Sequence, residues 1–281
     1  MRINPSLLVG GIIVAVFGVC AMLAPLLATH GIEQMDMPNR FAGPSAAHWL
    51  GTDNFGRDLW TRMIFGARVS LTIAVVSVVA AAAIGSAIGL IAGYAGGWID
   101  LALMRVADIF LGFPALVLAL AIVAVLGPGI ANVALALVLV HWTEYARVVR
   151  ASTLVLRELP YVQAARALGA SHARILIREI LPNAAGPIVV LATLGLGTAI
   201  LSESALSFLG FGVQPPAPTW GWTLAYGTRY LRNEPWLSIV AGLAIMLSVL
   251  GFNLLGDGLR DMLDPRRLSV PSRPRAAPSA S

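Results

Sequence analysis

The chain has 281 residues, of which 58% are hydrophobic and 12% charged, with a net charge of +5 and a mean hydropathy of +0.81. This composition excludes an ordinary soluble globular protein and predicts burial mainly in lipid. All 19 basic residues are arginine, so the chain lacks the lysine of a phosphate-binding loop or a Schiff base. Any ATP hydrolysis would therefore occur on another subunit. The arginines are distributed as in a membrane protein, and no nucleic-acid partner is expected.

Apolar runs of about the length needed to cross a bilayer recur along the chain. Six are found, at residues 7–27, 70–93, 101–125, 130–147, 187–210 and 236–255. They are continuous and do not alternate, which favours helices over a closed barrel. The predicted fold class is all-α: a polytopic membrane bundle of six transmembrane helices.

Three regions are expected from this pattern. Residues 1–68 form an N-terminal anchor helix and an external segment, and residues 69–265 form a core of five transmembrane helices. Residues 266–281 form a cytoplasmic tail that its Pro, Ala and Ser content predicts to be disordered. With the amino terminus inside, thirteen of the 19 arginines fall on the cytoplasmic side, in agreement with the positive-inside rule.

An arginine-rich segment, residues 158–182, separates the fourth and fifth spans. We predict two short helices outside the bilayer. Gly169 suits the left-handed position just past a helix end, and Ser171 can cap the second helix. The pair Leu181-Pro182 is expected to end that helix, because a residue before proline disfavours the helical region.

The spacing in this segment resembles the coupling loop of ATP-binding-cassette importer permeases, where Glu-Ala-Ala precedes Gly and then Leu-Pro at fixed distances. The corresponding residues here are Gln163, Ala164, Ala165, Gly169, Leu181 and Pro182. Gln163 departs from the glutamate of that pattern. The resemblance implies docking on a cytoplasmic ATPase that drives movement of the spans. An ordinary cytoplasmic helical hairpin is the alternative interpretation.

Further stretches resemble the C-type permease subunit of dipeptide, oligopeptide and nickel importers. They are Gly51–Leu71, Glu203–Trp220 and Phe252–Pro265. The resemblance implies a type I importer permease without catalytic activity or cofactor. It implies a multi-pass protein of the bacterial plasma (inner) membrane with cytoplasmic N- and C-termini. The implied partners are membrane lipid, a second permease chain in a heterodimer, two ATPase subunits, and an external binding protein that delivers a di- or oligopeptide. Nickel and glutathione are alternative substrates in the same family.

Ionisable residues inside spans are costly, at about 2.5–3.5 kcal/mol or more each. We expect Asp108 to pair with Arg105, and Glu144 with Arg147, along the surface of one helix.

Glu203 has no arginine nearby in the sequence. It either pairs across the bundle or faces a water-filled path, and Glu203 and Ser207 are the candidate path-lining residues. A secondary transporter is the rival class. It would need such groups at the midplane and usually two similar halves, and only Glu203 partly qualifies.

The remaining candidates for chemistry are few. The four histidines, His30, His48, His141 and His172, are dispersed in the sequence, so no metal centre is expected. The single cysteine permits no internal disulfide. No catalytic residues are predicted.

Overall fold

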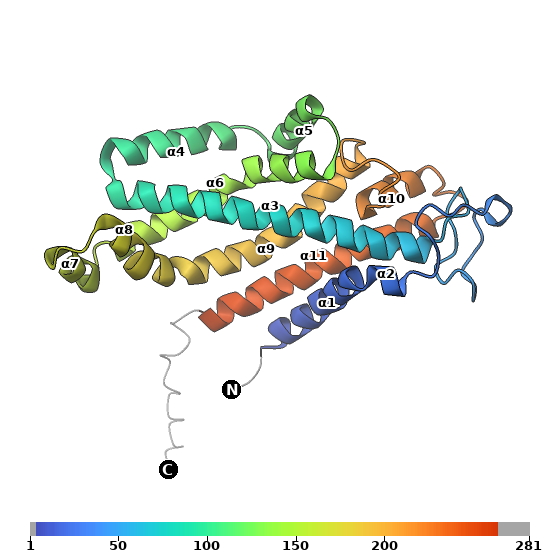
Figure 1. Ribbon diagram of the computed structural model, residues 1–281, viewed down its shortest axis with the longest axis horizontal. Coiled ribbons are helices and arrows are strands. Elements are labelled where there is room, and N and C mark those ends of the chain that lie inside the picture. Colours follow the sequence, from blue (N-terminus) through green and yellow to red (C-terminus); the bar gives the residue numbers. More distant parts are fainter. Residues whose placement is uncertain (1–3, 264–281) are drawn as a thin grey trace, which may run out of the picture.

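The computed structural model describes residues 4–263, which are almost entirely helical (Figure 1). Among them, β-structure is limited to one isolated bridge between Thr52 and Asp58. The tail expected at 266–281 lies outside the described residues. The elements in chain order are α1 (Pro5–Met22), α2 (Ala24–Leu27), η1 (Met37–Asn39), α3 (Leu59–Ala95), α4 (Gly97–Leu111), α5 (Ala115–Leu126), α6 (Ile130–Leu156), α7 (Pro160–Ala167), α8 (His172–Arg174), η2 (Ile175–Ile180), α9 (Leu181–Phe208), α10 (Trp220–Thr228) and α11 (Trp236–Leu263).

The all-α membrane bundle is confirmed for the described residues, but the count of six spans is not. Four helical runs are long and apolar enough to cross a bilayer: α1, α3, His172–Phe208 and α11. The expected span at 101–125 is instead the pair α4 and α5, bent by 87° at a short break. Helix α6 is long enough to cross a bilayer but not apolar enough, because polar and charged side chains from His141 onward lower its mean hydropathy.

Much of the surface of α6 is buried against other helices, although the side chains of Glu144 and Arg147 are about half exposed. Helix α6 packs along α3 at three glycines spaced four residues apart. A Cβ atom at Gly85 would lie 2.2 Å from the carbonyl oxygen of Trp142, and one at Gly89 would lie 2.4 Å from that of Ala146. Gly93 meets Thr153 in the same way. Small residues therefore allow the two backbones to approach closely.

Helix α3 begins well before the expected span at 70–93. The side chain of Asp58 accepts a hydrogen bond from the backbone N–H of Thr61 (2.8 Å), which caps the helix at its first turn. The early turns contain Arg62, which is buried with its Nε 3.6 Å from Asp53. The boundary expected after residue 68 consequently falls inside one continuous helix.

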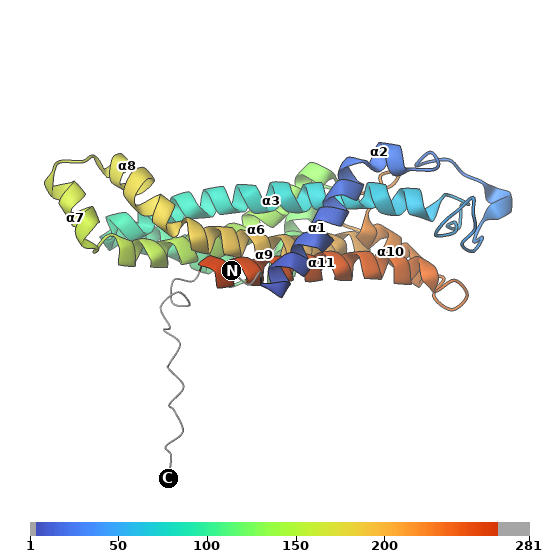
Figure 2. The same cartoon turned by 90° about the horizontal axis from the view of Figure 1, so that it is seen from below.

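The two ends of the bundle carry different structures. In Figures 1 and 2, α7 and α8 project at one end, whereas α10 and the segment between α2 and α3 lie at the opposite end. The core between them is apolar and includes Trp220, whose Nε1 donates to the carbonyl oxygen of Met63 (3.0 Å). The long helices thus separate α7 and α8 from α10 and the segment between α2 and α3.

Candidate coupling segment and buried carboxylate

The coupling segment, residues 158–182, begins with the helix α7 and a glycine turn. The backbone N–H of Ala170 donates to the carbonyl oxygen of Ala165 (3.1 Å), and that of Gly169 to Arg166 (3.0 Å). These two bonds close a helix end that requires a left-handed residue, and Gly169 has φ +80°. A Cβ atom there would meet nothing within 4 Å, so the requirement is for backbone conformation and not for space. The predicted left-handed glycine is confirmed.

The second half of the segment differs from the prediction. Ser171 caps α8 as expected, by accepting from the backbone N–H of Arg174 (3.4 Å). The prediction that Leu181-Pro182 ends the second helix is wrong, because α8, η2 and α9 form one helical run from His172 to Phe208. The element η2 is a π-helical turn directly before Pro182. An α-helical ladder here would bring the proline ring against a preceding carbonyl, whereas a π turn changes the bonding pattern and allows the helix to continue.

The predicted coupling residues divide between a small core and the surface. Ala165 and Leu181 are half-buried beside an apolar cluster that includes Val162 and Ile180. Gln163, Ala164 and Pro182 are exposed, and Gln163 Nε2 donates to the carbonyl oxygen of Arg157 (3.0 Å). The motif thus supplies both the core of the segment and part of its outer face.

The coupling segment is fastened to the end of α3. The hydroxyl of Tyr94 lies 2.8 Å from Nδ1 of His172, and the guanidinium of Arg166 lies 5.4 Å from the centre of the Tyr94 ring. Arg157 Nη1 donates to the carbonyl oxygen of Gly93 (2.8 Å). Sequence reasoning missed Tyr94, since it precedes His172 by 78 residues.

Leu168 and Ile177 are the most exposed large apolar side chains of the segment. Leu168 is 88% exposed and Ile177 is 63% exposed. Neither was predicted to be functional, because the segment contains many other apolar residues. Leu168 and Ile177 are therefore available for contact with another chain.

Glu203 lies in α9 and is fully buried, with 0% exposure. Its Oε2 accepts from the hydroxyl of Ser70 in α3 (2.9 Å) and, more weakly, from Ser204 (3.5 Å). Its Oε1 accepts from Ser207 (2.7 Å). We call these residues the Glu203 cluster. Within residues 4–263, Glu203 makes no ion pair, and three serine hydroxyls satisfy its buried carboxyl group.

Glu203 and Ser207, the two residues predicted to line a translocation path, are both buried in this conformation, with 0% exposure. The loop after α9 and the first turn of α10 cover the cluster. A Cβ atom at Gly212 would collide with the Ser207 side chain, and one at Gly221 would lie 2.4 Å from the carbonyl oxygen of Ser204. The cluster therefore joins α3 and α9.

Comparison with known proteins identifies the family to which this architecture belongs. The family of binding-protein-dependent transport system inner membrane components matches residues 85–269, which include the coupling segment and the whole Glu203 cluster except Ser70. The chain belongs to this family. The permease is thus an inner membrane component of an importer that works with other subunits, and the predicted resemblance is confirmed.

Individual relatives of the permease are similar over most of its length. It is 46% identical to the dipeptide transport system permease protein of Alkalihalophilus pseudofirmus, over 96% of this chain and 88% of that one. It is 46% identical to the glutathione transport system permease protein of Pectobacterium atrosepticum, over 80% and 74%. It is 41% identical to the probable D,D-dipeptide transport system permease protein of Escherichia coli, over 94% and 88%.

Two ion pairs of the permease, Asp108–Arg147 and Asp100–Arg150, connect α4 to α6, and the first of them corrects an expected pairing. Arg147 does not pair with Glu144; its Nη2 lies 2.6 Å from Oδ1 of Asp108. Arg105 lies farther from Asp108, at 3.9 Å. Because α4 and α6 pack together, Asp108 lies closer to Arg147 on the neighbouring helix than to Arg105 on its own helix. Both members of the Arg147–Asp108 pair are about half exposed, which limits the contribution of the pair to roughly 0.2–1 kcal/mol.

The histidines of the permease are not all dispersed, contrary to expectation. His141 lies beside Glu144 in α6 and His172 beside Tyr94. His30 and His48, although 18 positions apart in the sequence, stack on each other next to Asp58. A loop fold that no local pattern encodes brings them together.

Proposed function

We propose that the permease forms half of a path for di- or oligopeptides, paired with a second permease chain. Two cytoplasmic ATPase subunits and an external binding protein complete the proposed assembly. The coupling segment carries this proposal, because it is a compact helical unit with exposed apolar side chains and is built into two long helices. The dipeptide permeases among the relatives support the substrate class. Glutathione is the second candidate, supported by a relative of equal identity.

The proposed coupling is mechanical. The segment continues into α9 without a break and also contacts the end of α3 through Tyr94. An ATPase that pulls on α7 and α8 would therefore tilt α3 and α9 together, and these helices are already joined by the Glu203 cluster. A rigid unit linked to two helices in this way can switch a bundle between two packings. In this proposal the coupling segment and both termini are cytoplasmic.

Uptake by the reconstituted assembly tests the substrate. Proteoliposomes containing both permeases, the ATPases and ATP on the cytoplasmic side should accumulate a labelled dipeptide only when its binding protein is present outside. Excess glutathione should leave this uptake unchanged. Uptake of glutathione with no uptake of dipeptide would favour the second candidate, and uptake driven by a proton gradient without ATP would refute the importer assignment for this complex.

Leu168 provides a test of docking. Leu168→Glu should weaken ATPase association by about 30-fold or more, since losing an anchor and burying an unpaired charge costs at least roughly 2 kcal/mol. The variant should insert normally, because the side chain is 88% exposed. Leu231→Glu is the matched control, at an exposed leucine three residues after α10, the helix that lies at the opposite end of the bundle. Co-purification of the ATPase with each variant gives the measurement, and equal recovery from both would contradict docking through Leu168.

A further inference from the structure

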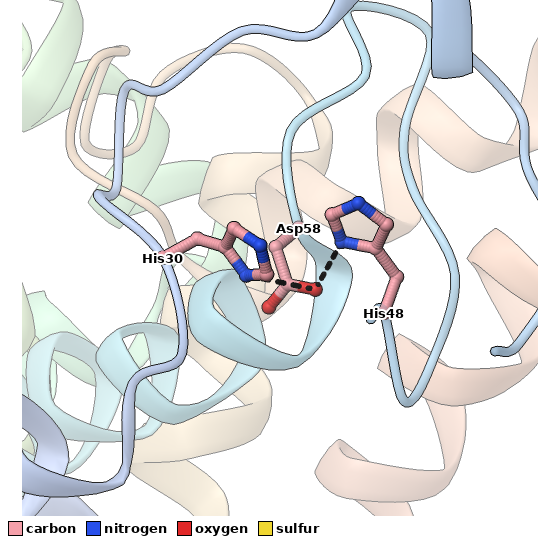
Figure 3. Close-up of side chains that lie close together, drawn as sticks. All are labelled: His30, His48 and Asp58. Atoms are coloured by element: carbon pink, nitrogen blue, oxygen red, sulfur yellow. Dashed lines mark hydrogen bonds and ion pairs between the residues drawn. The ribbon is translucent and has the colours of Figure 1, made fainter. Parts of the chain in front are cut away.

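Two histidines and an aspartate meet at the end of the bundle opposite the coupling segment (Figure 3). Both imidazole rings lie beside the Asp58 carboxylate in this view. Nδ1 of His48 is 2.9 Å from Asp58 Oδ1, and Nδ1 of His30 is 3.8 Å from the same oxygen. The rings stack with their centroids 4.5 Å apart. One donor atom from each residue can thus be chosen so that all three lie within 4.8 Å of one another.

The Asp58 carboxylate is held in place from its other side. Its Oδ2 accepts from the backbone N–H of Thr61 (2.8 Å) and from the hydroxyl of Thr29 (3.2 Å), which leaves Oδ1 directed at the two imidazoles. Hydrogen bonds of this kind orient the ligands of metal sites. Burial raises the pKa of Asp58, but the bonds from Thr61 and His48 outweigh burial and hold the pKa below its usual value. The Asp58 side chain is fully buried, and both of its oxygens are held by neighbouring groups.

A small cavity of about 60 Å³ adjoins the three residues. A water molecule occupies about 30 Å³ in the liquid, so the cavity has room for one ion and one water molecule. Its lining contains two carboxylates and two imidazoles but no arginine: His30, Gln34, Asp36, His48, Gly56 and Asp58. Gly56 has φ +70° and lies against the Asp36 backbone, where any side chain would collide. The site is therefore closely built, and its charge suits a cation.

We propose that His30, His48 and Asp58 bind one divalent first-row transition-metal ion of the Zn²⁺ type. Two imidazole nitrogens and one carboxylate oxygen are donors that such ions prefer, whereas Mg²⁺ and Ca²⁺ prefer oxygen alone. Tetrahedral zinc with bonds of about 2.0–2.2 Å places neighbouring donors about 3.3 Å apart. The distances of 2.9 and 3.8 Å to Asp58 Oδ1 lie on either side of this value. The ion replaces the proton that His48 Nδ1 donates to Asp58, and water from the cavity fills its fourth position.

The three ligands come from separate parts of one segment. His30 follows α2, His48 lies in the middle of the loop, and Asp58 caps α3. A bound ion therefore cross-links the loop to the first turn of α3. Because the ligands are gathered only in the folded chain, metal binding stabilises this end of the permease. The proposed effect of the ion is to hold the loop between α2 and α3 in a fixed conformation against the first turn of α3.

The experiment uses the full permease assembly, purified in detergent through an affinity tag without histidine and stripped of metal with a chelator. Zn²⁺ is titrated against a coloured chelator, and Co²⁺ is added separately because its visible absorption reports tetrahedral coordination. The variants are His30→Gln and His48→Gln. His141→Gln is the matched control, since it makes the same substitution beside Glu144, away from the cluster.

We expect the wild type and His141→Gln to bind one more Zn²⁺ than either cluster variant. Loss of a ligand should weaken binding at this site by at least about 10-fold, and the Co²⁺ absorption of the site should vanish. Added Zn²⁺ should raise the Tm of the wild type but not that of His30→Gln. If His48→Gln fails to fold, His30→Gln still decides, because the His30 side chain is 26% exposed. Identical stoichiometry, affinity and Co²⁺ spectra for the wild type and His30→Gln would overturn the proposal.

Discussion

Gly169→Val is expected to abolish coupled uptake while the permease still inserts and assembles with its partner permease. The left-handed conformation of Gly169 costs a residue with a side chain about 1–2 kcal/mol, and a β-branched residue is especially unsuited to it. The turn between α7 and α8 should therefore open, and α8 would leave its contact with Tyr94. Insertion depends on the apolar spans and should not change. ATPase recovery, ATP hydrolysis stimulated by loaded binding protein, and uptake are measured on the same reconstituted complex.

Gly169→Asn is the matched control for this experiment. Asparagine enters the left-handed region more readily than other residues with a side chain, and the space around Gly169 is open. The asparagine variant should retain most of the coupled uptake. Normal stimulated hydrolysis and uptake by the valine variant would show that the turn at Gly169 does not transmit movement.

The second large effect is expected at Glu203. Glu203→Ala removes the shared acceptor of Ser70, Ser204 and Ser207 and leaves a cavity between α3 and α9. We expect a loss of about 2–5 kcal/mol in stability, as for other large-to-small changes that also leave hydrogen bonds unmade. The measurements are the Tm and the yield of assembled complex. A drop in both is expected.

Glu203→Gln preserves the shape of the side chain and separates the two possible roles of Glu203. Serine hydroxyls can both donate and accept, so they can rotate to bond an amide, and the expected loss is within about 1 kcal/mol. Its assembly and uptake should be close to those of the wild type. If Glu203→Gln assembled normally but changed the substrate preference, the side chain would face the translocation path in another conformation.

The features that could be predicted from the sequence are those with local causes. Gly169 and Ser171 are placed correctly because turn and cap chemistry depends on a few neighbouring residues. The error at Pro182 arose because a π turn and tertiary packing allow the helix to pass a proline. Local rules describe the preference of the chain, and the surrounding helices can override it.

Long-range features could not be predicted in this way. The Glu203 cluster depends on Ser70, which is 133 residues away, and the Arg147–Asp108 pair depends on how α4 lies against α6. His30 and His48 meet Asp58 only through the path of a loop. A single sequence shows that these residues are polar or ionisable, but their partners follow from the fold.

The length of α3 has a consequence for its fit to the bilayer. At 1.5 Å per residue, its 37 residues extend over about 55 Å, whereas the hydrocarbon layer is about 30 Å thick. Even a tilt of about 40°, at the upper end for membrane helices, accommodates only about 39 Å of helix inside that layer. The remaining helix, roughly ten residues, must stand in the headgroup region or in water. The buried Arg62 and its contact with Asp53 lie within the first turns, so this hydrophobic mismatch is resolved by overhang at the end that bears Asp58.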